Sequence, residues 1–96
     1  MREKTIEAAL VDEVKRRGGF CPKFTSPGMG GMPDRLVLLP HGRFCFVEVK
    51  APGEKPRPLQ AYRHRQLRRL GIKVYVLDGP EQIEGILDGI EGGDAT

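Results

Sequence analysis

Two carboxylates and one lysine are spaced along this chain so that a single β-hairpin would bring them together. Asp34 precedes the tripeptide Glu48-Val49-Lys50 by thirteen intervening residues. Carboxylate oxygens are preferred ligands of hard cations such as Mg²⁺ or Mn²⁺, and a cation would offset the repulsion between two close carboxylates. A lysine beside the ion could orient an attacking water or stabilise charge on a phosphate. The spacing therefore predicts a metal-dependent site. The alternative is an ordinary charge cluster at a strand end, because Glu-x-Lys alone is common by chance.

The hairpin is predicted by two short β-prone runs and the loop between them. Residues 36–39 and 44–47 are apolar and contain residue types that favour strands. The loop Pro40-His41-Gly42 offers Pro for the second position of a type I turn and Gly for the left-handed position that follows. We therefore expect a three-residue hairpin loop.

The register of this hairpin decides whether the acidic residues meet. If Leu39 and Arg43 flank the loop, counting outward along both strands brings Asp34 directly opposite Glu48, with Cβ atoms roughly 5 Å apart. Strand alternation then places Lys50 on the same face as Glu48. This match favours a functional site over a chance tripeptide.

The elements around the hairpin read as one α/β domain spanning residues 1–96. Before the hairpin, the sequence predicts a helix over 2–17, a short edge strand over 20–24 and a glycine-rich loop over 25–32. After the hairpin, it predicts a linker over 51–58, a helix opened by Pro58 and a strand over 72–77. A short helix after Asp78-Gly79-Pro80 and a loose tail over 91–96 complete the prediction. This order, α-β-β-β-α-β-α, predicts a central mixed β-sheet flanked by helices on both faces.

Two of these segments carry burial predictions. The second helix has Leu59, Tyr62, Leu67 and Leu70 along one side, which we expect to pack on the sheet. In the strand over 72–77, the residues of both faces are apolar except for one lysine, so we expect this strand to be buried on both faces.

Basic residues are concentrated beside the predicted site. From Lys50 to Lys73 the chain has eight Lys or Arg residues and a single acid, Glu54, whereas the stretch from Asp78 onward is acidic. A basic region next to a metal site predicts a polyanionic substrate, with nucleic acid the leading candidate. An ordinary solvated helix face would also account for the arginines.

The cysteines and the hydropathy pattern further limit the kinds of protein that this chain could be. Cys21 and Cys45 lack CxxC or Cys/His spacing, so zinc is not expected, and mid-strand Cys45 reads as a core residue. No apolar run reaches membrane-spanning length and no secretory segment is evident, so we expect a cytoplasmic setting, which is the host cytoplasm if the chain is phage-encoded. With 96 residues the core is modest, and pairing with a second copy would help stability.

Short motifs run through most of the chain. They are Gly18-Gly19, Lys23-Phe24, Ser26-Pro27-Gly28, Gly31, Pro33-Asp34-Arg35, Glu48-Val49-Lys50, Leu59-Gln60 and Gly71. Together they closely resemble the VRR-NUC domain, the virus-type replication and repair nuclease branch of the PD-(D/E)xK superfamily, from about Glu7 to Leu77. The resemblance implies a restriction-endonuclease-like core that cuts phosphodiester bonds in DNA with Mg²⁺ or Mn²⁺. Stand-alone copies are typical of bacteriophages, resemble Holliday-junction resolvases and are expected to act on branched DNA as homodimers.

The resemblance also implies roles for individual residues. It makes Asp34 and Glu48 metal ligands, with the main-chain carbonyl of Val49 as a third oxygen, and Lys50 the residue that positions or activates water.

Two further catalytic residues are implied outside the hairpin. Glu7 matches a glutamate on the first helix that helps to hold the metal site, although its position alone suits a solvated charge. Gln60 matches a glutamine that contacts a metal-bound water or a phosphate, although it could be an ordinary first-turn residue.

Contacts to DNA are expected from a further set of residues around the site. They are Lys23, Ser26, Arg35, Lys55, Arg57 and Arg63. His41 is expected to be solvated, and Tyr62 to serve packing rather than base stacking. His64 lies among arginines, where DNA contact and plain exposure are equally open.

These observations predict a metal-dependent endonuclease selective for DNA structure. The alternatives are a nuclease without junction preference, a non-catalytic DNA-binding module that recruits a replication or repair complex, and a phosphoesterase for small molecules. Apolar residues such as Phe44, Phe46 or Ile86 are candidates for a dimer surface.

Overall fold

Three strands form one mixed sheet in the order β1-β2-β3. Strands β1 (Arg35–Leu39) and β2 (Arg43–Val49) form an antiparallel hairpin, and β3 (Val74–Leu77) pairs in parallel with the other side of β2. This computed structural model describes residues 1–92. The predicted mixed α/β architecture is confirmed.

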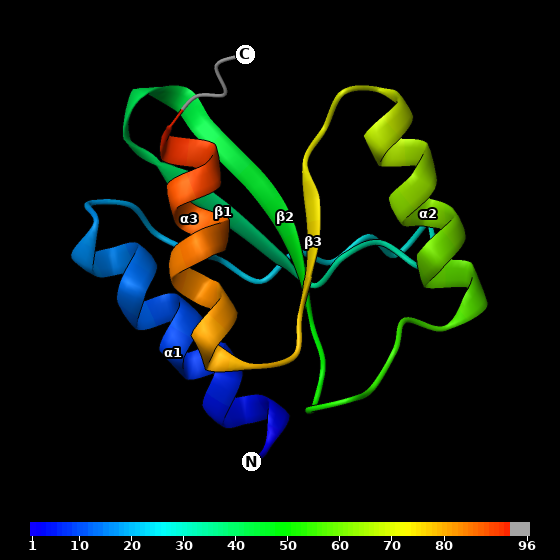
Figure 1. Cartoon of the computed structure of the whole chain (residues 1–96). Helices are drawn as coiled ribbons and strands as arrows, with labels where there is room; N and C mark the ends of the chain where they lie inside the picture. The colour runs from blue at the N-terminus through cyan, green and yellow to red at the C-terminus, as the bar shows by residue number, and fades with distance from the viewer. Residues whose placement is uncertain (93–96) are drawn as a thin grey trace.

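Helices cover both faces of the sheet (Figure 1). Helices α1 (Glu3–Arg16) and α3 (Ile83–Glu91) lie on one side, and α2 (Pro58–Arg69) lies on the other. Parallel strands need a crossover connection, which α2 supplies between β2 and β3. Two 3₁₀ turns, Pro40–Gly42 and Pro80–Gln82, complete the described elements. In residues 1–92 we find no helix with the length and apolar character needed to cross a bilayer.

The predicted hairpin register is confirmed. Leu39 pairs with Arg43 and Arg35 with Val47, so the next position outward sets Asp34 against Glu48. The turn differs from the prediction, because both His41 (φ 68°) and Gly42 (φ 72°) are left-handed, and a type I turn would keep the histidine at negative φ. Histidine is among the residues that tolerate this region better than most.

The edge strand predicted over residues 20–24 is not a regular strand, although the segment pairs with the outer edge of β1. This segment makes only two isolated bridges to the outer edge of β1, Phe20 with Leu38 and Lys23 with Arg35. Pro22 has no N–H to donate, which limits a regular ladder here. The segment still lines β1, and Gly19 approaches the Leu38 carbonyl so closely that a Cβ there would collide with it.

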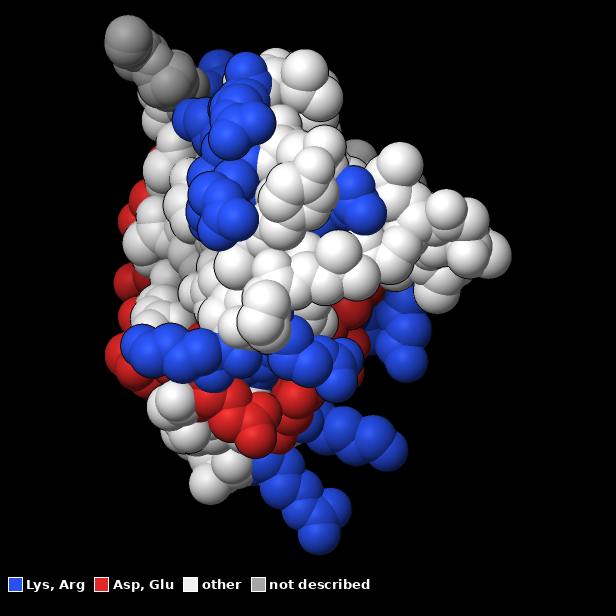
Figure 2. Space-filling model, turned by 90° about the vertical axis from the view of Figure 1, so that its right-hand side faces the viewer, with Lys and Arg blue, Asp and Glu red and all other residues white. Residues whose placement is uncertain are grey.

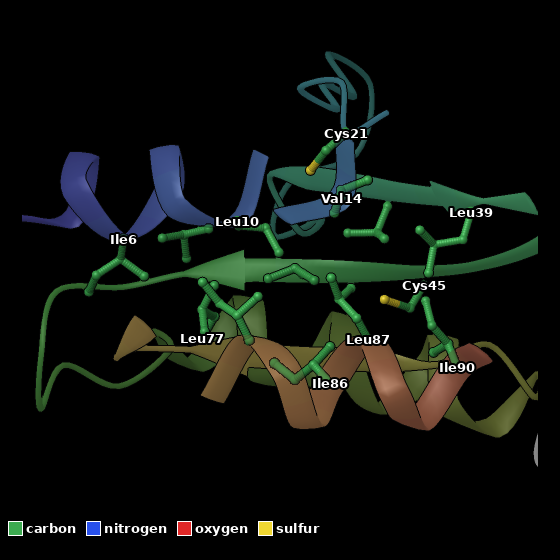
Figure 3. Packing of buried hydrophobic residues seen from close by; sticks show 14 residues of the cluster. Ile6, Leu10, Val14, Cys21, Leu39, Cys45, Leu77, Ile86, Leu87 and Ile90 are labelled. Atoms are coloured by element: carbon green, nitrogen blue, oxygen red, sulfur yellow. The ribbon is translucent and has the colours of Figure 1, made fainter. Parts of the chain in front are cut away.

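The main core fills the space between the sheet and the helices α1 and α3 (Figure 3). Leu10 of α1 and Leu87 of α3 point toward it from two sides. Its buried members are Ile6, Leu10, Val14, Cys21, Val37, Leu39, Cys45, Val47, Val49, Leu77, Ile83, Ile86, Leu87 and Ile90. The odd-numbered residues of β2 thus face α1 and α3, which confirms Cys45 as a core residue.

A smaller cluster lies on the opposite face, under α2. Its buried members are Phe46, Leu67 and Val74, and partly buried hydrophobic residues pack against them. Because strand residues alternate, Glu48 and Lys50 lie on this same side as Phe46. The hairpin therefore presents its acidic end toward α2.

Some burial predictions for α2 and β3 are wrong. On α2 only Leu67 of the four predicted apolar residues is buried, whereas Leu59, Tyr62 and Leu70 are exposed. The inward face of the helix instead contains His64, three residues from Leu67. Strand β3 is the edge of the described sheet, so its two middle residues are only half-buried.

Two of the three residues predicted as candidates for a dimer surface are not accessible. Phe46 and Ile86 are buried, and Phe44 alone of the three is exposed. A loose tail was predicted over 91–96, but Glu91 is the last residue of α3, and residues 93–96 lie outside the described part of the chain.

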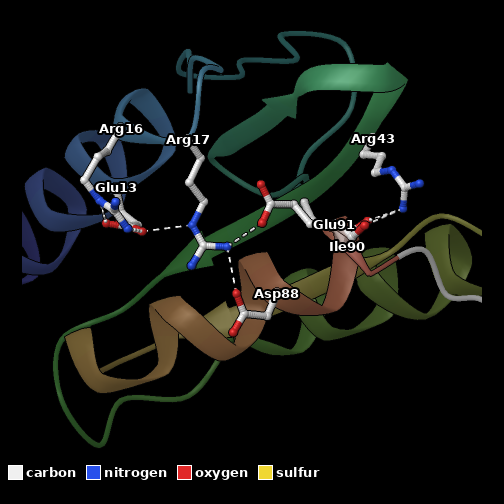
Figure 4. Close-up of polar contacts among 7 residues, drawn as sticks. All are labelled: Glu13, Arg16, Arg17, Arg43, Asp88, Ile90 and Glu91. Carbon is white, nitrogen blue, oxygen red and sulfur yellow. Dashed lines mark hydrogen bonds and ion pairs between the residues drawn. The ribbon is translucent and has the colours of Figure 1, made fainter.

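A charged cluster ties the end of α1 to the end of α3 (Figure 4). The Arg17 guanidinium lies 2.8 Å from Glu13 Oε2, 2.9 Å from Asp88 Oδ1 and 2.8 Å from Glu91 Oε1. Arg43, at the start of β2, donates to the Glu91 carbonyl at 2.6 Å. These contacts fix the layer of helices against the hairpin at the end remote from Asp34.

Candidate active site

An open cleft of about 620 Å³ lies where β2 leaves the sheet and the chain turns toward α2. Its lining residues are Glu3, Met32, Asp34, Glu48, Val49, Lys50, Glu54, Lys55, Arg57 and Gln60. The apolar residues of β2 anchor its end in the core, while the linker after Lys50 turns back through Gly53, whose φ is 82°. The end of β2 therefore forms the floor of the cleft, and the linker and the start of α2 add Glu54, Lys55 and Arg57 to its lining.

Glu48 is the most deeply buried charged group of the cleft, with 3% of the residue exposed. Burial raises the pKa of its carboxyl to about 7; Asp34 also raises it, and Lys50 acts in the opposite direction. Its Oε2 accepts a hydrogen bond from Gln60 Nε2 at 3.1 Å and lies 3.9 Å from Lys50 Nζ. Its Oε1 is buried and has no hydrogen-bond partner among the described residues.

Asp34 faces this carboxylate from the first position before β1. The buried Pro33 precedes it, and the backbone N–H of Val49 donates to its Oδ1 at 3.2 Å. Burial raises the pKa of Asp34, the Val49 hydrogen bond opposes that rise, and the acidic residues Glu7 and Glu3 add to it. Two carboxyls with raised pKa values therefore share one end of the hairpin.

Lys50 and Gln60 complete the inner part of the cleft. The backbone N–H of Lys50 donates to the Leu77 carbonyl at 2.8 Å, which continues the parallel pairing beyond β2 and fixes the lysine's position. Gln60 lies in the first turn of α2, where its Oε1 accepts the backbone N–H of Arg57 at 2.8 Å. One amide therefore caps the helix and also holds Glu48.

The donor set fits a hard divalent cation. Among residues 1–92, no three His, Cys, Asp or Glu side chains are grouped so that they could hold a metal ion by themselves. Asp34, Glu48 and the Val49 carbonyl offer only oxygens, and ions such as Mg²⁺ complete such sets with water. The raised pKa values of both carboxyls are a feature that a bound cation would relieve.

Glu7 and Arg35 lie beside the cleft and pair with each other. Arg35 Nε lies 2.9 Å from Glu7 Oε2, and its Nη1 donates to the Cys21 carbonyl at 2.7 Å. Arg35 is thus engaged internally, with 14% of its side chain exposed, which disfavours the expected DNA contact. Glu3, one helical turn before Glu7, lines the cleft instead. Helical spacing of four residues was the signal that could have suggested it.

The other residues expected to contact DNA are distributed unevenly. Lys55 and Arg57 line the cleft. Arg63 lies farther along α2 and donates to the Gly30 carbonyl at 2.9 Å, which attaches the glycine-rich loop to the helix. Lys23 is exposed and Ser26 is half-buried, and neither lines the cleft.

His64 belongs to the site, although the sequence did not predict it there. It is 1% exposed, so the expectation of solvent exposure or DNA contact is wrong. Its Nε2 lies 3.6 Å from Glu48 Oε1. Burial lowers the pKa of its imidazole, and Arg68 and Lys50 lower it further. Its spacing of four residues from Gln60, on one face of α2, was the available signal.

Fold and site together define a small α/β domain with a paired-carboxylate and lysine site at the end of a hairpin. The sequence profile of the VRR-NUC domain matches residues 23–81, a span that includes Asp34, Glu48, Lys50 and Gln60 but not Glu7. A solved structure titled "VRR_NUC domain" superposes with a TM-score of 0.84 at 32% identity, covering 90% of this chain and 94% of the other.

A curated relative from a bacteriophage is closer in sequence. The "Putative nuclease p44" of Acyrthosiphon pisum secondary endosymbiont phage 1 is 54% identical over 81 residues, which is 84% of this chain and 87% of that protein. The chain therefore belongs to the VRR-NUC family, and the predicted family is confirmed.

Proposed function

We propose that this protein is a Mg²⁺- or Mn²⁺-dependent endonuclease that hydrolyses phosphodiester bonds in branched DNA, with four-way junctions as its preferred substrate. The observation that carries this proposal is the opposition of Asp34 and Glu48 across the hairpin, with Lys50 Nζ 3.9 Å from Glu48. Membership of a nuclease family and the likeness to a phage protein named as a nuclease support the same chemistry.

The carboxylates and the lysine take separate roles in this proposal. Asp34, Glu48 and the Val49 carbonyl would hold the cation, which when bound would supply Lewis-acid activation of a phosphate oxygen and of a water. Lys50 orients that water and stabilises charge on the phosphate. Gln60 keeps the Glu48 carboxylate in place through its 3.1 Å hydrogen bond.

Binding of the DNA backbone is assigned to the basic residues of the cleft. Figure 2 views the side of the molecule that carries α2, where Lys and Arg side chains gather around a small acidic group in the lower half. Lys55 and Arg57 lie at the cleft itself, so they can bring a phosphate to the carboxylates. Phosphate contacts carry little sequence information, which suits recognition of DNA shape.

The proposed functional unit is a homodimer. A four-way junction requires two cuts, and a symmetric pair of subunits places two active sites at a fixed separation. Small size and the family resemblance support pairing, and Phe44 is an exposed apolar residue available for it.

Cleavage of labelled four-way junction, flap, single-stranded and linear duplex DNA tests the proposal. Each substrate is incubated with Mg²⁺ or Mn²⁺ and with wild-type, Asp34→Ala or Lys50→Ala protein, each variant checked for folding. Asp12→Ala and Lys73→Ala serve as matched controls, since both residues are exposed and neither lines the cleft. We expect paired symmetric nicks on the junction, lost in the two cleft variants and retained in both controls.

Other outcomes contradict separate parts of the proposal. Equal cutting of all substrates would remove the junction preference but keep the nuclease. Tight binding without cutting in either metal would indicate a non-catalytic module. Turnover of nucleotides but not DNA would indicate a small-molecule phosphoesterase.

A further inference from the structure

His64 lies beside the carboxylate of Glu48 and has no role in the proposed chemistry described above. Its Nε2 is 3.6 Å from Glu48 Oε1, and both side chains are almost completely buried. Neither of these two atoms has a hydrogen-bond partner among residues 1–92. Buried polar atoms nearly always have a partner, so two unpaired atoms that face each other require an explanation.

Helix α2 presents two nitrogen-bearing side chains to one carboxylate. Gln60 and His64 are four residues apart and therefore lie on the same face of the helix. Gln60 donates to Oε2 of Glu48, and His64 faces Oε1.

We infer that His64 is a positioning residue for Glu48: its Nε2–H donates to Oε1 and, together with Gln60, fixes the plane of the metal-binding carboxylate. This inference rests on the proposed metal-dependent function. At 3.6 Å the contact is too long for a hydrogen bond, but such bonds in unliganded sites are often long and tighten when the site is loaded. The neutral Nε2–H tautomer and the imidazolium both supply this donor, so no change of protonation is required.

The role of His64 has measurable consequences for the cation. Groups that orient a metal ligand typically change metal affinity or activity by about 10–100-fold when they are removed. Loss of the His64 donor should therefore weaken Mn²⁺ binding and lower kcat, while KM for DNA stays the same, because His64 is buried and does not reach the DNA.

Two amide substitutions separate the hydrogen bond from mere polarity. His64→Gln places an N–H near the position of Nε2, whereas the side chain of His64→Asn is too short to reach Oε1. Isothermal titration with Mn²⁺ alone, on the full chain, should give His64→Gln an affinity close to wild type and His64→Asn an affinity weaker by about tenfold or more. Leu67→Val, which loosens the same helix without touching Glu48, controls for packing and should bind Mn²⁺ like wild type.

Spectroscopy of the wild-type protein gives a test that does not depend on how variants fold. The chain has two histidines, and a His41→Gln protein assigns their signals. Long-range ¹H–¹⁵N spectra should show His64 protonated at Nε2, with a shift that changes when Mg²⁺ is added. An unprotonated Nε2 would overturn the inference.

The Mn²⁺ titrations can also overturn the inference. A folded His64→Asn protein with wild-type Mn²⁺ affinity, or a His64→Gln protein as weak as His64→Asn, would overturn the role of His64 and leave the nuclease intact. Wild-type protein that neither binds Mn²⁺ nor cleaves DNA would overturn the proposed function and this inference together.

Discussion

Gln60 on α2 donates from Nε2 to Oε2 of Glu48 on β2 at 3.1 Å, while its Oε1 accepts the backbone N–H of Arg57 at 2.8 Å. Gln60→Glu would keep the acceptor that caps the helix but replace the donor with a second carboxylate oxygen. We expect a loss of roughly 1–3 kcal/mol in the free energy of unfolding at pH 8 in EDTA, and a smaller loss at pH 6, because Glu48 is then largely protonated.

Urea unfolding at the two pH values measures this effect, and Gln60→Ala is its control. The alanine loses both hydrogen bonds but adds no charge, so its destabilisation should vary less with pH. Equal losses for Gln60→Glu at pH 6 and pH 8 would contradict the arrangement.

The raised pKa of Glu48 predicts that the metal-free protein loses stability as pH rises. Burial raises this pKa from the usual 4.5 to about 7, so the folded state binds more protons than the unfolded state between those values. The stabilisation is present below about pH 4.5 and is lost as pH rises through 7, by at most about 3 kcal/mol. The raised pKa of Asp34 acts in the same direction. Urea unfolding in EDTA from pH 5 to 8.5 measures it.

Glu48→Gln is the matched control for this titration, since it removes the carboxylate and keeps the shape. His64, whose pKa is lowered, contributes with the opposite sign below pH 6.5, and because it faces Glu48 the two proteins are compared above that pH. The stability of Glu48→Gln relative to wild type should rise with pH. Added Mn²⁺ should stabilise wild type most above pH 7, where both carboxylates are free to bind it.

Lys55 and Arg57 at the cleft rim predict a salt-dependent affinity for DNA. Each phosphate contact that is lost should reduce the slope of log affinity against log salt by about 0.9 on duplex arms. We expect Lys55→Gln and Arg57→Gln each to show this reduction when binding is measured by fluorescence anisotropy with the Asp34→Asn protein as background. Lys73→Gln, away from the cleft, should leave the slope unchanged. A slope unaffected by either rim substitution would place the DNA elsewhere.

The hairpin could be predicted from the sequence because its signals are local. Strand alternation and a Pro-x-Gly loop fix which residues oppose each other, so Asp34 and Glu48 were placed correctly without any tertiary information. The loop was predicted to have a positive φ only at Gly42, and His41 has one as well. The type of turn depends on how the two strands are joined, which the loop residues alone do not determine.

The helix α2 shows where local signals fail. Its apolar residues Leu59, Tyr62 and Leu70 look like a core stripe, yet they are exposed. The side chain that enters the interior is His64, because a buried carboxylate lies opposite it. Which face of a helix turns inward depends on the partner surface, and that surface is formed by a segment sixteen residues away in sequence. Gln60 was found only through the family resemblance.

Gly31 supports the glycine-rich loop against the start of α2. Its φ is 81°, and a Cβ at this position would lie 2.7 Å from the Leu59 carbonyl oxygen. We expect Gly31→Ala to lower the free energy of unfolding by about 1–3 kcal/mol, through both the strained backbone and the displaced helix turn. Gly28→Ala in the same loop meets nothing within 4 Å and should change stability by less than about 0.5 kcal/mol. Comparable losses in thermal or urea unfolding would contradict this packing.

Arg17 joins the end of α1 to the end of α3 and is remote from the cleft, so its loss should affect stability without affecting chemistry. Arg17→Met would leave Glu13, Asp88 and Glu91 without their shared cation, and only 11% of the arginine side chain is exposed. We expect a loss of roughly 1 kcal/mol, or a fall of about 4–8 °C in Tm, that shrinks at high salt. Arg16→Met is the matched control: its side chain is 69% exposed and pairs with Glu13 alone, so its effect should be much smaller. Both proteins should cleave DNA at the wild-type rate well below Tm. A reduced rate for Arg17→Met under those conditions would show that the helix layer transmits its geometry to the hairpin end where Asp34 and Glu48 face each other.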